Sequence, residues 1–317
     1  MKALITGIAG FAGGHLTRYL LGRGDEVAGI EQCEVKDCEE FAKAYKVKVF
    51  QGDIRDENII SKAIKQFKPD AIFHLAAQSS VKRSFEDPFD TFSANSIGTL
   101  VLLETVSHSE STMNVLVISS SEVYGRLEPE ECPVKEDHPF RPVNPYAVSK
   151  ATVDLMAYQY HKAYNMPVYI ARAFSHSGPG QKTVGVLSDW AFQVAKIDLG
   201  RAQPVIKVGN MQVRRDYTDV RDVVRAYVDI IEQGKPGEAY NVCAGVGYEL
   251  TELLEKYKKF ANAEIEIVVD QSRMRPVDIP ILIGSNEKIK EDTGWQPVIP
   301  IETTLRDIYE YWREHFE

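Results

Sequence analysis

The chain has 317 residues, of which 44% are hydrophobic and 26% are charged, and its formal net charge is −9. This composition is typical of a globular protein with a large core, and the negative charge argues against nucleic acid as a partner. Because no apolar run reaches the roughly 18 residues of a membrane span and no leader precedes the first strand, we expect a cytoplasmic protein without a membrane partner.

Strand and helix signals alternate through the first half of the chain. Runs rich in branched apolar residues predict buried strands at Lys2–Thr6, Glu26–Ile30, Val47–Gln51, Ala71–Leu75, Asn114–Ser120 and Pro167–Ala171. Between them lie amphipathic stretches of helical length, at Ala12–Gly22, Glu57–Phe67, Asp90–His108 and Pro145–Tyr164. This alternation predicts an α/β fold with a doubly wound parallel Rossmann sheet.

After Arg172 the alternation becomes less regular. We expect short strands at Val205–Val208 and Tyr240–Cys243, and helices at Leu187–Leu199, Asp219–Gln233, Glu249–Phe260 and Pro300–His315. We interpret this half as a smaller C-terminal substrate lobe that is interleaved with the last elements of the sheet. The predicted Rossmann domain comprises residues 1–172 plus 212–245, and the substrate lobe residues 173–211 plus 246–317.

A glycine-rich turn joins the first predicted strand to the first helix. Gly7 allows the chain to turn tightly, Gly10 allows the backbone to approach a pyrophosphate, and Gly13 allows the helix to pack closely on the sheet. Free N–H groups and the dipole at the N-terminus of the helix favour an anion there. The turn therefore predicts a dinucleotide-binding site.

Two carboxylates follow the next strands. Glu31 ends the second strand, where it can accept hydrogen bonds from the adenosine ribose hydroxyls and would repel a 2′-phosphate. This predicts NAD as the preferred cofactor, although Lys36 leaves NADP open and Glu31 can instead be a solvated surface residue. Asp53 follows the third strand, where it either bonds an adenine amine or caps the next helix.

A Ser-rich strand end and a Tyr-Lys pair predict the catalytic site. Ser120 lies at the carboxyl end of the fifth strand, and Asn144 can cap the helix that carries Tyr146 and Lys150 at positions i and i+4. An ammonium beside a phenol lowers the pKa of the phenol, so we expect Tyr146 to exchange protons with a substrate oxygen. Ser120 would hydrogen-bond the same oxygen, and Lys150 can also hold the nicotinamide ribose.

These features together resemble the extended short-chain dehydrogenase/reductase family of NAD-dependent epimerases and dehydratases. The resemblance covers essentially the whole chain and is carried by the glycine turn, residues 73–77, Asn95, Ser119-Ser120, Tyr146 with Lys150, residues 177–181 and residues 215–222. Within the family, the second half is most similar to GDP-4-keto-6-deoxy-mannose reductases, and GDP-mannose 4,6-dehydratases come next. The resemblance implies a nucleotide-sugar enzyme with Ser120, Tyr146 and Lys150 as its catalytic trio.

The resemblance also implies the other site residues. Cofactor contacts are expected from Gly7, Gly10, Phe11, Ala12, Glu31, Asp53, Ile54, Leu75, Ala76, Ala77, Asn95, Tyr146, Lys150 and His176. Contacts with a substrate, GDP-linked by this resemblance, are expected from Ser79, Glu122, Ser175, Val208, Asn210, Arg215, Arg275 and Asp278. Two guanidiniums, Arg215 and Arg275, suit a diphosphate because each can bond oxygens in pairs. At Ser175 the family usually has Asn, so the sugar is not fixed by this match.

Two reactions remain open. A reductase would use NAD(P)H to reduce the C4 keto group of GDP-4-keto-6-deoxy-mannose, with Tyr146 as proton donor. A GDP-mannose 4,6-dehydratase also needs an acid and base near C5 and C6, and Glu122, two residues after Ser120, is expected to project to the same side and to serve. The sequence favours the reductase, with Glu122 then bonding the neighbouring backbone. A 4-epimerase and a non-catalytic Rossmann protein are the remaining alternatives.

Two further expectations concern assembly and cysteine chemistry. Helices Asp90–His108 and Pro145–Tyr164 carry more apolar and small residues than one sheet face needs, which favours a homodimer through a four-helix bundle over simple burial in the monomer. The four cysteines, Cys33, Cys38, Cys132 and Cys243, are expected to be reduced thiols. Because Cys33 and Cys38 lack a second pair of ligands, no metal is expected.

Overall fold

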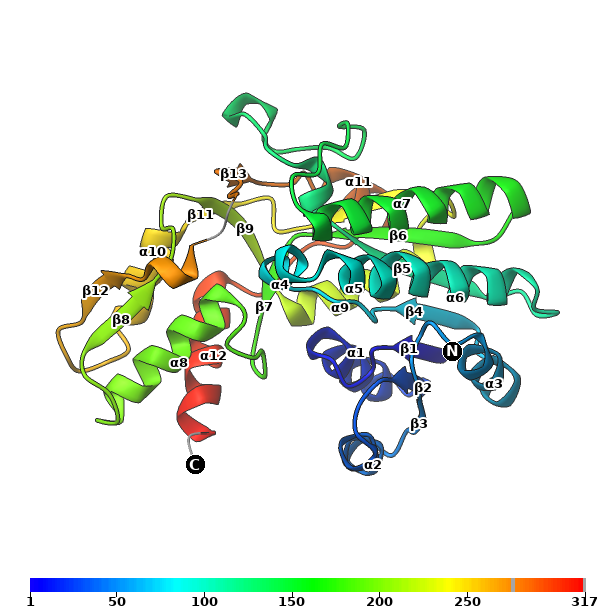
Figure 1. Cartoon of the computed structure of the whole chain (residues 1–317), viewed down its shortest axis with the longest axis horizontal. Coiled ribbons are helices and arrows are strands. Elements are labelled where there is room, and N and C mark those ends of the chain that lie inside the picture. The colour runs from blue at the N-terminus through cyan, green and yellow to red at the C-terminus, as the bar shows by residue number, and fades with distance from the viewer. Residues whose placement is uncertain (275–276, 316–317) are drawn as a thin grey trace.

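The computed structural model describes residues 1–274 and 277–315, and Figure 1 shows a large part built on one sheet beside a smaller part. The large sheet has seven strands in the order β10-β6-β5-β4-β1-β2-β3, all paired in parallel. Strand order therefore reverses between β1 and β4, the switch point at which doubly wound folds bind ligands. The predicted α/β Rossmann architecture with a smaller lobe is confirmed.

Most elements of the large part lie within a residue or two of their predicted bounds. The strands are β1 Lys2–Thr6, β2 Glu26–Glu31, β3 Lys48–Gln51, β4 Ala71–His74, β5 Asn114–Ser120, β6 Val168–Ala173 and β10 Ala239–Val242. The helices around them are α1 Phe11–Gly22, α2 Val35–Tyr45, α3 Glu57–Phe67, α4 Val81–Glu86, α5 Pro88–Phe92, α6 Gly98–Ser107, α7 Pro145–Tyr164, α9 Val220–Gln233 and α11 Glu287–Thr293.

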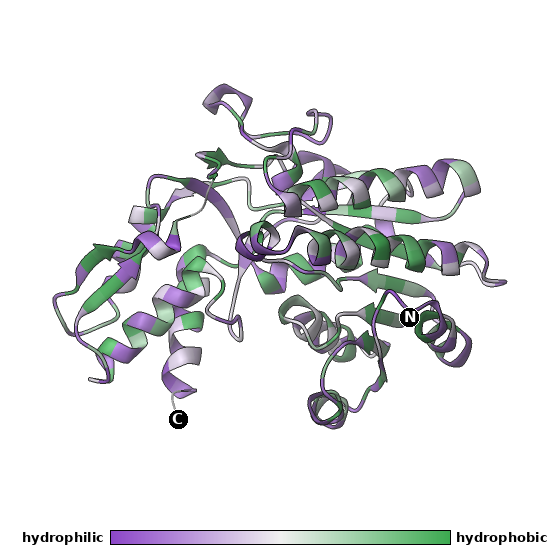
Figure 2. Cartoon of the chain, viewed as in Figure 1, coloured by the Kyte–Doolittle hydropathy of each residue, from purple (hydrophilic) through white to green (hydrophobic). Residues whose placement is uncertain are grey.

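Alternate residues of the central strands pack into two separate hydrophobic cores, one on each face of the sheet. On β1, Ala3 and Ile5 join a buried cluster with α1 and α9, whereas Leu4 joins a cluster with α3, α6 and α7. This is the period-2 alternation of a strand that is covered on both faces. Figure 2 shows the resulting apolar colouring along the strands of the large sheet.

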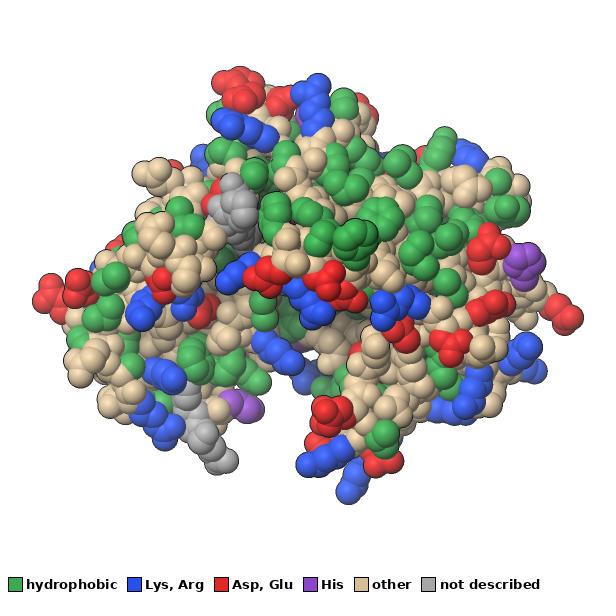
Figure 3. Space-filling model, in the orientation of Figure 1, with side chains coloured by type: hydrophobic (Ala, Val, Ile, Leu, Met, Phe, Trp, Pro, Cys, Tyr) green, Lys and Arg blue, Asp and Glu red, His purple; other side chains and the backbone are tan. Residues whose placement is uncertain are grey.

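The smaller part holds shorter sheets. Its elements are β7 Ser175–Ser177, α8 Val186–Asp198, β8 Val205–Val208, β9 Arg214–Asp219, β11 Gly247–Glu249, α10 Leu250–Lys258, β12 Glu266–Val269, β13 Ile281–Leu282 and α12 Ile301–Glu314. Strand β9 pairs with β7, β11 and β13, while β8 pairs with β12. The surface is hollowed between the two parts (Figure 3). The predicted domain boundaries stay a proposal.

One helical prediction needs correction, and three helices, α2, α4 and α11, were not predicted. The segment predicted as one helix over Asp90–His108 begins earlier, with α5 at Pro88, and contains a π-helical turn at Ser93–Ile97 before α6. Helix α2 was not predicted, because Cys38 is the only fully buried residue in it and its apolar stripe is short.

The structure joins Cys33 and Cys38 in a disulfide, whereas Cys132 and Cys243 are free. The expectation of four reduced thiols is therefore wrong for this pair. Helix α2 supplies the physical reason, because its first turn brings the Cα of Cys38 to 5.9 Å from that of Cys33, within the range that a disulfide spans.

Within the described ranges, no helix has the length and apolarity needed to cross a membrane. Among the same residues, no group of His, Cys, Asp and Glu side chains could hold a metal ion.

Candidate active site

The glycine turn packs as tightly as the sequence requires. Gly7 has a φ of +72°, and a Cβ there would lie 2.9 Å from the Ala76 nitrogen; a Cβ on Gly13 would lie 2.1 Å from the Gly7 oxygen. Gly10 is the N-cap of α1, and no acidic residue lies in the first turn of that helix. No side chain caps this helix, and its own first turn carries no carboxylate, which fits the pyrophosphate of a dinucleotide.

Glu31 and Asp53 lie at the carboxyl ends of β2 and β3. The Glu31 carboxylate accepts hydrogen bonds from the Ala9 amide in the glycine turn, at 2.8 Å, and from the Gln32 amide, at 3.0 Å. Asp53 is paired with the Arg55 guanidinium, which lowers the pKa of its carboxyl. The helix-cap alternative for Asp53 is wrong, because Asp56, three residues later, caps α3 through the Asn58 amide.

A buried hydrogen-bonded chain, missed at the sequence level, links the glycine turn to α6. Thr6 accepts from the Ala76 amide and lies 2.8 Å from His74 Nδ1, while His74 Nε2 lies 2.9 Å from Thr99 Oγ1. Because the Thr99 hydroxyl donates to the Asn95 carbonyl, at 2.6 Å, Nε2 must donate to Thr99, and Nδ1 then accepts from Thr6. Burial and the nearby Lys150 charge lower the pKa of His74 to about 3, so the ring stays neutral.

Asn95 is held in position by the hydrogen bond that its carbonyl accepts from Thr99 and by the hydrogen bonds of its own side chain. Its amide donates to the Gln78 carbonyl and to Ser149 Oγ, and its carbonyl oxygen accepts from the Gln78 amide. Asn95 therefore ties the π-helical turn to α7 and to the segment after β4. That segment also contains Leu75, Ala76 and Ala77, and it follows β4 at the switch point of the sheet.

Strand β5 and helix α7 bring the predicted trio together. Ser120 ends β5, its side chain is a hydrogen-bond partner of Tyr146, and the Ser119 hydroxyl donates to the Lys150 carbonyl at 3.3 Å. Lys150 is buried, and its ammonium donates to the Ile118 carbonyl at 2.7 Å. The predicted cap of α7 is confirmed, because Asn144 Oδ1 accepts from the Ala147 amide.

The charges in the trio differ from the prediction. Burial raises the pKa of Tyr146 to about 12, with a further increase from the Glu122 charge, while the Ser120 hydrogen bond opposes the rise. The expected lowering of this pKa by Lys150 is therefore wrong. Burial instead lowers the pKa of Lys150 itself to about 8. At neutral pH the Tyr146 phenol therefore keeps its proton, and Lys150, four residues later on the same helix, is still mostly an ammonium.

The expectation that Glu122 projects from a strand end is wrong. Strand β5 stops at Ser120, and Glu122 lies in a short 3-10 helix, Ser121–Tyr124, so strand alternation does not determine its direction. Its carboxylate accepts a hydrogen bond of 2.9 Å from the Asn144 side-chain amide. Glu122 is nevertheless close enough to act on the pKa of Tyr146.

Several of the predicted substrate residues lie in the smaller part, as does His176, which was predicted as a cofactor contact. Ser175 and His176 lie on β7, where His176 stacks on Phe11 with ring centroids 6.2 Å apart and donates from Nδ1 to the Phe174 carbonyl. Asn210 donates to the Asp278 carboxylate at 2.9 Å, so the structure brings these two together.

The remaining predicted contacts differ in accessibility. Arg215 on β9 is buried, and one of its nitrogens donates to the Arg214 carbonyl. The Val208 side chain lies in the core of the smaller part, so it offers no side-chain contact to a substrate. Ser79 is exposed in the segment between β4 and α4, Ile54 is buried, and Arg275 lies outside the described residues.

This arrangement can bind a dinucleotide and transfer a proton next to it. The glycine turn and Glu31 lie on one side of the switch point, and the proton-donating phenol with its Ser and Lys partners lies on the other. Sequence reasoning found the trio from its spacing. It missed Thr6, His74 and Thr99, for which the only signal was the unexplained His in the motif at residues 73–77.

Comparisons with known proteins agree with this geometry. The family model for GDP-mannose 4,6 dehydratase matches residues 4–308. A GDP-6-deoxy-D-mannose reductase from Pseudomonas aeruginosa is 35% identical, covering 98% of this chain and 97% of that protein. A GDP-mannose 4,6-dehydratase from Yersinia enterocolitica is 30% identical, covering 95% of this chain and 91% of that protein.

Solved structures are similar over the whole chain. RMD from Pseudomonas aeruginosa complexed with NADPH has a TM-score of 0.87 and 33% identity, covering 99% of both chains. The Thermus thermophilus UDP-glucose 4-epimerase complex with NAD has a TM-score of 0.87 and 29% identity, covering 99% of this chain and 100% of that one. The chain therefore belongs to the GDP-mannose 4,6 dehydratase family of extended short-chain dehydrogenases/reductases, and is an NAD(P)-dependent enzyme that acts on a nucleotide sugar.

Proposed function

We propose that this enzyme reduces the C4 keto group of GDP-4-keto-6-deoxy-mannose with NAD(P)H. The observation that carries this choice is the similarity to a GDP-6-deoxy-D-mannose reductase over nearly the full length of both chains. The geometry supports it, because a keto reduction needs one proton donor beside the hydride acceptor, and Tyr146 with Ser120 and Lys150 provides that donor.

Each residue of the catalytic trio has its own role in the proposed reduction. When bound, the reduced nicotinamide supplies a hydride to C4 of the sugar. Tyr146 holds a proton at neutral pH because burial raises its pKa, and it delivers this proton to O4 as negative charge develops there. Ser120 hydrogen-bonds the same oxygen, and the Lys150 ammonium stabilises the phenolate that remains after the transfer.

Substrate recognition is assigned to the smaller part. Arg215 on β9 is proposed to bond the diphosphate of the substrate, and Arg275 is proposed as its second guanidinium. The hydrogen-bonded pair of Asn210 and Asp278 lies on neighbouring segments and is proposed to contact the nucleoside. Ser175 and His176 follow β6, next to the trio in sheet order, and are proposed to face the sugar and the nicotinamide.

The second candidate is a GDP-mannose 4,6-dehydratase, which the matching family model and Glu122 favour. That reaction needs an acid and a base near C5 and C6 of the sugar. The Glu122 carboxylate is close to Tyr146 but is bonded to Asn144, the residue that caps α7. This bond supports a positioning role and therefore the reductase.

For the cofactor, we propose a preference for NAD(H) over NADP(H). Glu31 is held in place by the amides of Ala9 and Gln32, so its charge lies at the end of β2 next to the glycine turn. A fixed carboxylate there binds ribose hydroxyls and repels a 2′-phosphate. The similar structure of RMD from Pseudomonas aeruginosa is complexed with NADPH. A measured preference of this enzyme for NADH over NADPH would therefore test the proposed role of Glu31 directly.

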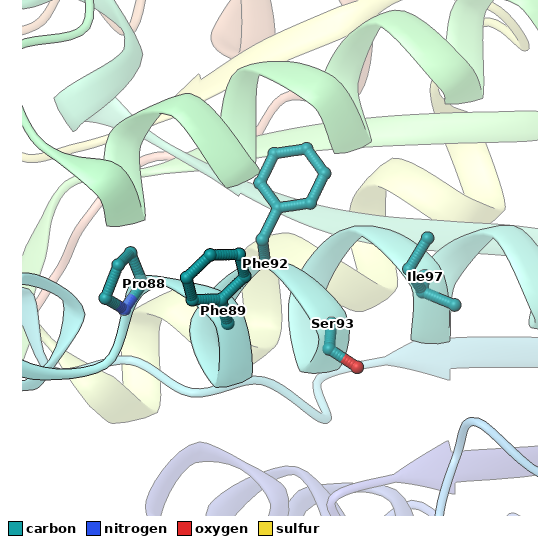
Figure 4. A pocket seen from close by; sticks show the side chains of 5 residues that line it. All are labelled: Pro88, Phe89, Phe92, Ser93 and Ile97. Atoms are coloured by element: carbon teal, nitrogen blue, oxygen red, sulfur yellow. The ribbon is translucent and has the colours of Figure 1, made fainter.

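We also propose a homodimer through α5, α6 and α7, and a cytoplasmic location. Apolar side chains gather over these helices (Figure 3), including Phe89, which is 88% exposed, and Leu155, which is 61% exposed. Figure 4 shows a pocket on this face, lined by Pro88, Phe89, Phe92, Ser93 and Ile97. A patch of this kind is typical of a protein interface.

The dimer is tested by Phe89→Asp and Leu155→Asp. Light scattering after gel filtration should give a dimer for the wild type and a monomer for the double variant, because two carboxylates would be buried in the interface. Val184→Asp, at another exposed apolar residue on the loop before α8, is the matched control and should remain dimeric. A monomeric wild type would contradict the dimer.

The proposed reaction is tested by two incubations of the purified enzyme. One contains GDP-mannose with NAD, and the other GDP-4-keto-6-deoxy-mannose with NADH or NADPH, while absorbance at the nicotinamide band and sugar products are followed. Cofactor oxidation only with the keto sugar supports the reductase. A keto sugar formed from GDP-mannose without net change in the cofactor would establish the dehydratase instead.

A further inference from the structure

The disulfide between Cys33 and Cys38 lies at the turn between β2 and α2. Cys33 follows Glu31 by two residues, and Cys38 lies in the first turn of α2, which begins at Val35. Cys33 is half-buried and Cys38 is buried. The disulfide therefore closes the short connection that leaves the proposed adenosine end of the cofactor site.

Hydrogen bonds connect this turn to the cofactor site. The Cys33 carbonyl accepts from the Gln51 side-chain amide at 2.9 Å, which fixes the turn to the end of β3. On the other side, the Glu31 carboxylate accepts from the Ala9 amide in the glycine turn. Only Gln32 separates Cys33 from Glu31 in the chain, so a movement of Cys33 reaches Glu31 through the backbone, and Glu31 is the group proposed to bind the ribose.

Helix α2 has little else to fix its N-terminus. Its N-cap residue, Glu34, makes no side-chain capping bond, and Cys38 is the only residue of the helix that is fully buried. Uncapped helix ends fray readily, since their first amides lack partners. The disulfide encloses only a few residues, so it restricts the unfolded chain little and its effect is local.

We infer that Cys33 and Cys38 form a redox-modifiable pair whose state sets the affinity of the adenosine half of the NAD(P) site. This inference rests on the proposed cofactor site. With the bond intact, the turn holds Glu31 in the orientation that binds the ribose. With the bond broken, the first turn of α2 frays, Glu31 gains freedom, and ordering it again costs part of the binding free energy.

The redox step requires a dithiol reductant. One thiolate of the reductant attacks Sγ of the half-buried Cys33, the bond to Cys38 breaks, and Cys38 leaves as a thiolate that takes up a proton. The second thiol of the reductant then displaces Cys33. The protein gains two electrons and two protons, and the reductant becomes a disulfide.

The test compares NADH binding to the full chain after treatment with dithiothreitol or with oxidised glutathione. Alkylation followed by mass spectrometry first establishes the state of the two cysteines. We expect the Kd for NADH to be about three- to tenfold higher in the reduced protein, the effect of losing one well-held hydrogen-bonding group. The kcat at saturating NADH should be unchanged, because β5 and the trio lie three strands away from β2.

Two variants control this comparison. Cys33→Ser removes the bond but leaves the buried Cys38 in place, and it should show the higher Kd under both treatments. Cys132→Ser changes a cysteine that is free in the structure and should respond like the wild type. Equal Kd values in the two redox states, or thiols that stay reduced with oxidised glutathione, would overturn the inference alone. Absence of NADH binding in both states would overturn the cofactor site as well.

Discussion

The side-chain amide of Asn144 donates a 2.9 Å hydrogen bond to the Glu122 carboxylate, while its oxygen accepts from the Ala147 amide at 2.7 Å. Asn144 thus caps α7, the helix that carries Tyr146 and Lys150. It also holds the Glu122 carboxylate, whose role distinguishes the reductase from the dehydratase. A carboxylate used in this way positions its neighbours, and its charge raises the pKa of Tyr146.

Glu122→Gln should therefore separate the two reactions. The amide can still accept from Asn144, so the reductase should keep at least about a tenth of its kcat, whereas a dehydratase that uses Glu122 as base should lose about 10²-fold or more. The measurement is kcat with the keto sugar and with GDP-mannose. Glu130→Gln, at an exposed residue of the short 3-10 helix Pro129–Glu131, is the matched control and should behave like the wild type.

Tyr146→Phe should lower kcat by about 10²- to 10⁴-fold, because it removes the proton donor. The Kd for NADH, from fluorescence titration, should change less than about threefold, because the phenylalanine ring keeps the packing of α7. Tyr158→Phe, at an exposed residue of the same helix, controls for loss of a phenol. Turnover retained by Tyr146→Phe would refute the assignment of the trio.

Glu31→Lys should change the cofactor preference. Replacing a carboxylate that repels a 2′-phosphate by an ammonium that attracts it should raise the NADPH to NADH ratio of kcat/KM by about tenfold or more. Glu39→Lys, at an exposed residue of α2, makes the same charge change away from the glycine turn and should leave the ratio nearly unchanged. A constant ratio in Glu31→Lys would show that this carboxylate does not read the ribose.

The pH dependence of kcat/KM for the cofactor should report the ionisation of Lys150. Because burial lowers its pKa to about 8, the ammonium is present below that pH and is lost as the pH rises through it. The value of kcat/KM for the cofactor, which follows ionisations of the free enzyme, should therefore fall above about pH 8. In Lys150→Arg, whose guanidinium stays charged, any remaining activity should lack this alkaline fall. A flat profile to pH 10 in the wild type would contradict the role of Lys150.

The sequence predicted those parts of the site that local spacing determines. Tyr146 and Lys150 share a helix face because they are four residues apart, and the glycine turn follows a buried strand directly. The chain from Thr6 through His74 to Thr99 could not be predicted, because it joins three elements that only the packed sheet brings together. Burial is likewise a tertiary property, so the sequence predicted the wrong direction for the pKa of Tyr146.

Errors in local structure have equally specific causes. Asp53 and Asp56 are both plausible caps by residue type, and the pairing of Asp53 with Arg55 decides between them. The π-helical turn at Ser93–Ile97 contains Asn95, whose buried side-chain hydrogen bonds cannot be recognised from a periodic pattern of apolar residues. The disulfide depends on where α2 begins, and that helix has too short an apolar stripe to be recognised.

The most direct test of the proposed reaction follows an isotope. The enzyme is mixed with GDP-4-keto-6-deoxy-mannose and NADH that carries deuterium at both positions of nicotinamide C4, and the product is analysed by mass spectrometry and NMR. The reductase proposal predicts that one NADH is oxidised for each sugar consumed and that deuterium appears at C4 of the product. Unlabelled sugar and unoxidised NADH, together with conversion of GDP-mannose to the keto sugar by the same preparation, would contradict it.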